Sequence, residues 1–284
     1  MKRVSREQTV PPDQRCLALD PVAEVEQGES FVVETINFRT PVVRRPEDAN
    51  PETFREREET GPIYVRGVRA GDVLAVHVEE VRPEGHASGG WWEAPQVASF
   101  LEIREGRVHF PGGLSAPLQM MIGDIYVMPA EPVPNPWDNG GNMDYRDVCA
   151  GHTLLLRAER EGGMLVLGDL HAAQGWGEVL GLGAECAGEV RLSVTVEQRY
   201  RPERPMVLKD GAFACIACRS TFGEARDLAA GDAAHVLARL LGCTRGEAHL
   251  YATTVGSLMN GAVWYAGEAE HPPIVVGLEV PFPP

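Results

Sequence analysis

The sequence lacks any apolar run that approaches the roughly 18 residues of a transmembrane helix. Its opening residues, MKRVSREQTV, are polar and contain no apolar core of a secretion signal. Basic residues are also scarce, since 26 Lys and Arg stand against 41 Asp and Glu, a net charge of −15. A negative net charge of this size repels the phosphate backbones of nucleic acids and anionic membranes. We therefore expect a cytoplasmic protein with no nucleic-acid partner and no membrane partner.

Several catalytic and binding motifs are missing as well. There is no G-x-S-x-G, which argues against a serine hydrolase of the α/β type. The Gly-rich stretch WDNGGN (137–142) has no lysine and no following helix, so it is not a phosphate loop. Cys215-x-x-Cys218 has no second cysteine pair nearby, so the six cysteines are expected to be reduced and this pair to lie in a buried strand.

What the chain does have is 31 glycines and 22 prolines scattered between short apolar runs over 284 residues. That punctuation is typical of many strands joined by turns. The predicted fold class is mainly β, with a small α+β element at the C-terminus. Residues 1–200 are expected to form a β-rich domain that carries the site, and 201–284 an α+β subdomain packed on it, although one domain with an appendage fits the length equally well.

Alternating apolar residues predict strands within 26–38, 61–85, 107–132 and 185–200, and a hairpin over 152–169. Residues 44–60 are charged and contain proline, so they are expected to form a surface loop. Helices are predicted over 231–242, which has one apolar stripe, and over 244–255, where Thr244 and Glu247 match a capping box.

Two segments are too polar to be simple turns, PWDNGGNMDYRD (136–147) and GDLHAAQGWGEV (168–179). Asp169 and His171 stand two residues apart at a strand end, so both side chains point to one side, and Asn142 and Asp144 have the same spacing. If the segments are adjacent, Gln174 and Glu178 join these four side chains. A carboxylate and an imidazole aimed together suit a divalent metal. The alternative is that these acids only cap turns and accept backbone hydrogen bonds.

The order of GPIYVRGVRAGDVLAVHV, IGDIYVMPAEP, NGGNMD and GDLHAAQGWGEV resembles the acetamidase/formamidase family. The resemblance covers about residues 24–255. It implies a mostly β protein with jelly-roll-like and barrel-like parts, and hydrolysis of a short linear amide to a carboxylate and ammonia. It also implies a bound divalent metal, zinc first, with calcium or another divalent ion as the alternative. A small neutral amide is then the expected substrate partner, and a homodimer or larger homo-oligomer the expected assembly.

The chemistry of these residue types assigns candidate roles. Asp144, Asp169 and His171 are the candidate metal ligands. Glu178 is the candidate general base, with a structural carboxylate as the alternative. Asn142 and Gln174 are candidates to hold the carbonyl or the amide of the substrate.

Two positions depart from the family pattern. Family members often have His where Asn139 stands, and an acidic residue where Trp176 stands. These changes leave two other functions open. One is hydrolysis of another C–N bond, in a bulkier amide, a carbamate or a ureide. The other is a non-catalytic protein that binds a small molecule on the same fold.

Overall fold

The structure is a computed structural model that describes residues 1–37, 59–91, 94–179, 181–263 and 274–281. The predicted loop over 44–60 therefore lies outside the described residues up to position 58, and residues 59 and 60 begin a strand. The described strands are β1 (Lys2–Val4), β2 (Thr9–Val10), β3 (Ala23–Val25), β4 (Phe31–Thr35), β5 (Glu59–Val65), β6 (Val73–Trp91), β7 (Ala94–Arg104), β8 (Arg107–His109), β9 (Ser115–Pro117), β10 (Met121–Val127), β11 (Gly140–Asn142), β12 (Thr153–Arg157), β13 (Leu165–His171), β14 (Glu185–Glu197), β15 (Met206–Lys209), β16 (Ala212–Arg219), β17 (Ser257–Asn260) and β18 (Ile274–Pro281).

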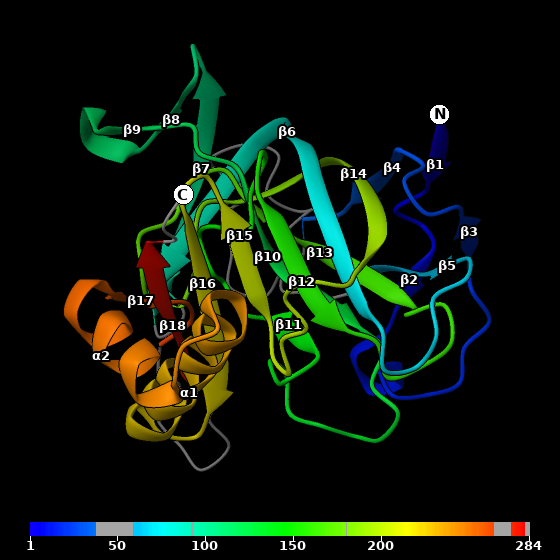
Figure 1. The fold of residues 1–284 in the computed structure, drawn as a ribbon. Coiled ribbons are helices and arrows are strands. Elements are labelled where there is room, and N and C mark those ends of the chain that lie inside the picture. Colours follow the sequence, from blue (N-terminus) through cyan, green and yellow to red (C-terminus); the bar gives the residue numbers. More distant parts are fainter. Residues whose placement is uncertain (38–58, 92–93, 180, 264–273, 282–284) are drawn as a thin grey trace.

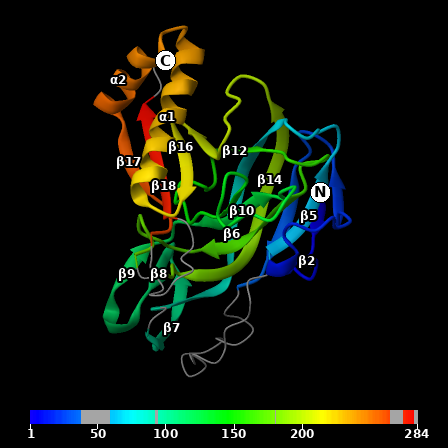
Figure 2. The ribbon, with the colours of Figure 1, turned by 90° about the horizontal axis from the view of Figure 1, so that it is seen from below.

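The helices are α1 (Phe222–Leu241) and α2 (Arg245–Val255), with 3₁₀ turns η1 (Pro12–Gln14) and η4 (Pro111–Gly113). Both views of the ribbon place α1 and α2 at one end of the molecule and the N-terminal strands at the other, while β7, β8 and β9 project from the body (Figure 1, Figure 2). The mainly β architecture with a helical C-terminal element is confirmed. The sheet is not closed among the described strands, so a barrel-like part is not confirmed.

The central pair of the fold is the antiparallel pair β6–β14, which runs from Val73 opposite Glu197 to Ser88 opposite Glu185, with register shifts between Arg191 and Leu192 and between Cys186 and Ala187. Val190, Leu192 and Val194 of β14 are buried, and the residues between them are half-buried, as the two-residue period of a strand requires. Strand β12 pairs with the Val73 end of β6, and β4 pairs with β14. This frame holds the main apolar core.

Strand β13 connects the frame to a second set of strands. It pairs antiparallel with β10 along Met121–Val127, and β10 in turn pairs with β11. At its C-terminal end β13 also pairs with the start of β14, where His171 lies opposite Glu185. Three strand ends that are distant in sequence therefore meet at one place.

The C-terminal element extends the sheet through β15, β16, β18 and β17 and covers it with the two helices. Ala229, Ala233 and Leu237 of α1 pack with Phe213 of β16 in a second core cluster. Cys215 and Cys218 are both buried in β16, and all six cysteines are free, as predicted. No described helix is long and apolar enough to cross a membrane.

Two details of the prediction were wrong. The strands predicted as a hairpin over 152–169 both form, but β12 pairs with β6 and β15, whereas β13 pairs with β5, β10 and β14. Helix α1 starts near residue 222 instead of 231, capped by Thr221, which accepts a hydrogen bond from the amide of Glu224. Its first turns bury only the small side chains Ala225 and Ala229, so they lack the large apolar stripe that marks the later turns.

The capping box predicted at Thr244 is present and gives a test of local stability. The Thr244 hydroxyl accepts from the amide of Glu247, and the Glu247 carboxylate accepts from the amide of Thr244. We expect Thr244→Ala to lower the free energy of unfolding by about 1 kcal/mol, because the amide of Glu247 at the start of α2 loses its side-chain acceptor. Urea denaturation measures this loss. Thr253→Ala, at an exposed position of the same helix, is the control and should change stability by less than about 0.5 kcal/mol.

Candidate active site

The six side chains singled out in the sequence all lie around the meeting point of β10, β11, β13 and β14. Asp169 and His171 project from the end of β13. Asp144 follows β11, and its amide donates to the carbonyl of Gly123 in β10 over 3.1 Å. Glu178 lies in a turn whose neighbour Gly177 donates to the carbonyl of Asn260 in β17 over 2.9 Å. The convergence expected from the two polar segments is therefore observed.

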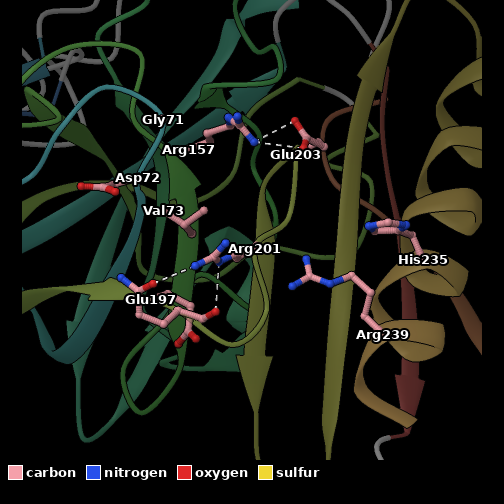
Figure 3. A pocket seen from close by; sticks show the side chains of 10 residues that line it. Gly71, Asp72, Val73, Arg157, Glu197, Arg201, Glu203, His235 and Arg239 are labelled. Atoms are coloured by element: carbon pink, nitrogen blue, oxygen red, sulfur yellow. Dashed lines mark hydrogen bonds and ion pairs between the residues drawn. The ribbon is translucent and has the colours of Figure 1, made fainter. Parts of the chain in front are cut away.

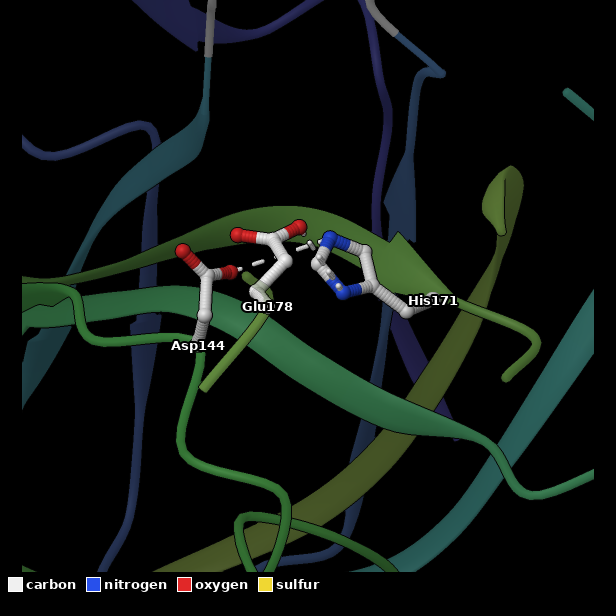
Figure 4. A group of neighbouring side chains, drawn as sticks. All are labelled: Asp144, His171 and Glu178. Atoms are coloured by element: carbon white, nitrogen blue, oxygen red, sulfur yellow. Dashed lines mark ion pairs between the residues drawn. The ribbon is translucent and has the colours of Figure 1, made fainter. Parts of the chain in front are cut away.

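His171 is the centre of this cluster (Figure 4). Its Nε2 lies 3.6 Å from Asp169 Oδ1 and 3.7 Å from Asp144 Oδ1. Its Nδ1 lies 4.0 Å from Glu178 Oε1. His171 and Asp144 are completely buried, and Asp169 and Glu178 are buried nearly as well. An imidazole with carboxylates on both sides is thus enclosed in the protein.

Glu185 is a fifth member of the cluster that sequence reasoning missed. Its Oε2 lies 3.0 Å from His171 Nε2, and its side chain is buried. It arrives through the pairing of β13 with β14, which places it directly opposite His171. Its only sequence signal is its position at the start of a predicted strand, and the partner of that strand cannot be read from local spacing.

Two amide side chains hold the cluster in position. Gln174 contacts His171 Nδ1 through its Oε1, and its Nε2 donates to the carbonyl of Asp144 over 2.7 Å. Because Oε1 can only accept, His171 carries a proton on Nδ1, and its Nε2 faces Asp144, Asp169 and Glu185. Asn142 Nδ2 donates to Asp144 Oδ2 over 2.9 Å.

The backbone is strained where the carboxylates sit. Six non-glycine residues among those described have a positive φ, and three of them are Asp144 (46°), Asp169 (55°) and Glu178 (40°). Such conformations persist only where the surrounding structure enforces them, and they concentrate at functional sites. Gly123 makes room for this arrangement, because a Cβ there would lie 2.6 Å from Asp144 Oδ1 and 2.8 Å from the carbonyl of Asp169.

The electrostatics of the cluster are dominated by unbalanced negative charge. Burial alone would lower the pKa of His171, but Glu185 and Asp169 outweigh it and raise that pKa well above its usual range. Burial, and then repulsion from Asp144, raise the pKa of Glu178 well above the usual range of a carboxyl group. His171 can offset only one of four buried carboxylates, so the cluster favours an additional cation.

The donor set fits a divalent metal. The structure contains two groups whose ligand atoms lie within 4.8 Å of one another: Asp144, His171 and Glu178, and Asp169, His171 and Glu185. Two ligand atoms each about 2.1 Å from an ion with tetrahedral geometry lie about 3.4 Å apart. The distances from His171 Nε2 to Glu185, Asp169 and Asp144, which are 3.0, 3.6 and 3.7 Å, bracket this value. Neither carboxylate oxygen of Glu178 has a hydrogen-bond partner among the described residues.

A cavity of about 690 Å³ adjoins the cluster and includes Gln174 and Glu178 in its wall. Trp176, one of the two departures from the family pattern, also lines it. Asn139, the other departure, lies elsewhere. Its side chain donates to the carbonyl of Val127 over 2.8 Å, and Val127 pairs with Leu165, at the opposite end of β13 from His171. Asn139 therefore lies outside the carboxylate cluster.

The chain resembles known proteins over the region that carries the cluster. Residues 116–222, which include every member of the cluster, match the model of the Acetamidase/Formamidase family. The crystal structure of an acetamidase from Bacillus halodurans superposes with a TM-score of 0.87 at 28% identity, over 98% of this chain and 97% of that one. A predicted acetamidase/formamidase from Thermoanaerobacter tengcongensis gives a TM-score of 0.88 at 26% identity, over 99% and 95% of the two chains.

A curated relative from Schizosaccharomyces pombe, named "Putative formamidase", is 23% identical over 252 residues. That match spans 62% of this chain and 62% of the length of the relative. The sequence motifs, the fold and the matched region all resemble the acetamidase/formamidase family.

Proposed function

We propose that this chain is a metal-dependent amidohydrolase that converts a linear amide of the formamide or acetamide type to a carboxylate and ammonia. The observation that carries the proposal is the buried cluster of four carboxylates around His171 in the wall of a cavity. Relatives named acetamidase and formamidase support the choice of amide as the bond that is cleaved.

In this proposal Asp144, Asp169 and His171 hold the metal, and Glu185 joins them because it lies nearest to His171 Nε2. We propose zinc, since a mixed set of one imidazole and several carboxylates suits it, with calcium or another divalent ion as the alternative. When bound, such an ion polarises the amide carbonyl and lowers the pKa of the attacking water.

Glu178 is proposed as the general base. Its carboxylate is buried in the wall of the cavity, and its raised pKa brings proton exchange closer to neutral pH. It accepts a proton from the attacking water as the new C–O bond forms. It then returns that proton to the nitrogen as the C–N bond breaks and ammonia leaves.

The two amide side chains take positioning roles. Gln174 fixes the tautomer of His171, and Asn142 orients Asp144. That either side chain also holds the substrate carbonyl or amide stays a prediction from the sequence, as do a homodimer or larger assembly, a cytoplasmic location and a domain division at residues 201–205.

Replacement of the proposed base is the first prediction. We expect Glu178→Gln to lower kcat for ammonia release from acetamide by about 10²–10⁴-fold, because the amide cannot accept the proton of the attacking water. Metal content and the urea midpoint should stay within error of the original protein. Glu105→Gln is the matched control, since Glu105 is exposed and also has a positive φ of 52°. Full activity in Glu178→Gln with normal folding would show that Glu178 is only structural.

Metal retention is the second prediction, and it does not depend on turnover. We expect the purified protein to hold a divalent metal, and Glu185→Gln to weaken its binding at least tenfold because the cluster loses an anionic ligand. Equilibrium dialysis followed by elemental analysis measures this and identifies the ion. Glu189→Gln, in the same strand and paired with Arg3 and Arg82 at the surface, should bind metal as the original protein does. Equal retention in both variants would remove Glu185 from the ligand set.

Chelation is the third prediction. We expect removal of the metal to abolish ammonia release from formamide and acetamide, and addition of zinc to restore it, because the water at the site then loses its activation. Release that survives complete removal would contradict the metal-dependent mechanism. No release from any amide by folded, metal-loaded protein would favour a non-catalytic binding protein.

A further inference from the structure

The cavity beside Glu178 is much larger than a short amide needs. Its volume is about 690 Å³, and water in the liquid occupies about 30 Å³ per molecule, so the space equals that of roughly twenty waters. Acetamide has only four non-hydrogen atoms. Pockets of about 300–1,000 Å³ typically enclose ligands that are much larger than acetamide, and the volume of this cavity lies in that range.

The wall of this cavity is mainly apolar and comes from three parts of the fold. Leu101 of β7 and Phe110 before η4 form one side, and Ala116 of β9 contributes to it. Trp176 and Leu182 come from the segment between β13 and β14. An apolar wall favours an apolar ligand, because water leaves both surfaces when they meet.

Trp176 is fixed in position at the boundary between the wall and the carboxylate cluster. Its ring meets that of buried Tyr145 edge-on, with centroids 5.2 Å apart, and the guanidinium of Arg146 lies 5.8 Å from its centroid. Arg146 is itself anchored by donating to Gln119 Oε1. Trp176 therefore presents a rigid aromatic surface two residues away from both Gln174 and Glu178.

We propose that the substrate is a primary amide with a bulky apolar acyl group, which lies in the cavity against Trp176 while its carboxamide reaches Glu178. This inference rests on the proposed amide hydrolysis and replaces formamide and acetamide by a larger amide as the preferred substrate. Trp176 is then a specificity residue, because it supplies an apolar surface to the wall.

A second cavity, of about 350 Å³, offers no comparable wall. It is lined largely by charged side chains, and Figure 3 shows Arg157 donating to both carboxylate oxygens of Glu203. Arg201 donates to Gln198. This cavity also includes Glu197, which lies at the opposite end of β14 from Glu185. It cannot hold the acyl group of an amide placed at Glu178.

The test compares kcat/KM for ammonia release from formamide, acetamide, hexanamide and phenylacetamide with metal-loaded protein. Each methylene buried in the cavity should raise kcat/KM by up to about fourfold. We expect hexanamide and phenylacetamide to exceed acetamide at least tenfold. If acetamide equals or exceeds both larger amides, the inference is wrong while the proposed amide hydrolysis stands.

Two variants of the cavity wall and one control variant test whether the preference for larger amides arises in this cavity. Trp176→Ala and Ala116→Phe should each lower the ratio of kcat/KM for hexanamide to that for acetamide at least fivefold, the first by removing contact surface and the second by filling the cavity. Leu114→Phe is the control, because Leu114 is 71% exposed, stands two residues from Ala116 and is not part of the wall. An unchanged ratio in both cavity variants would overturn the assignment of this cavity.

A binding measurement separates failure of the inference from failure of the proposed function. If no amide is hydrolysed, calorimetric titration with hexanamide and with acetamide still tests the cavity. Tighter binding of hexanamide that is lost in Ala116→Phe and kept in Leu114→Phe would support the acyl site without catalysis. Equal or absent binding of the two amides would overturn it.

Discussion

The interaction on which the site depends is the burial of four carboxylates around a single imidazole. Asp144, Asp169, Glu178 and Glu185 repel one another at the distances observed around His171, and burial removes the water that would screen them. Such a cluster requires secondary structure that holds the carboxylates in place against their mutual repulsion. Strands β13 and β14 supply it, and the positive φ of three of the four acids shows that the fold holds them against local backbone preference.

A second group of buried acids, in β5 and β10, shows how the protein balances such charges with its own cation. Asp124, beside Gly123 in β10, lies 3.2 Å from the guanidinium of Arg15, which also pairs with buried Glu59. Arg15 alone therefore neutralises part of the charge of two carboxylates, and its guanidinium stays protonated at any physiological pH. In the candidate site a single histidine faces four carboxylates, and Gln174 holds its ring in place. That contrast favours a metal ion at the site, because an imidazole that gives up its Nε2 proton is a metal ligand, whereas a guanidinium is not.

How much of this could be predicted from the sequence depends on the range of the interaction involved. The sequence predicts that Asp169 and His171 act together, because side chains two residues apart along one strand point to the same side. It predicts the capping box at Thr244, because that motif involves only residues three positions apart in the chain. Glu185 and the true partners of β12 and β13 were missed because strand pairing joins residues far apart in the chain. The start of α1 was missed because its first turns bury only alanines, which leave little apolar periodicity to detect.

The two departures from the family pattern have different consequences because they occupy different places. Asn139 is tied to Val127, at the far end of β13 from His171, so its change leaves the ligands of the cluster in place. Trp176 lies on the wall of the cavity, next in space to Tyr145 and two residues from Glu178. A change there alters the wall of the cavity and replaces no member of the carboxylate cluster. Asp169, His171 and Glu185 of the cluster lie at the ends of β13 and β14, whereas Trp176 lies in the segment between these strands, which also carries Gln174 and Glu178.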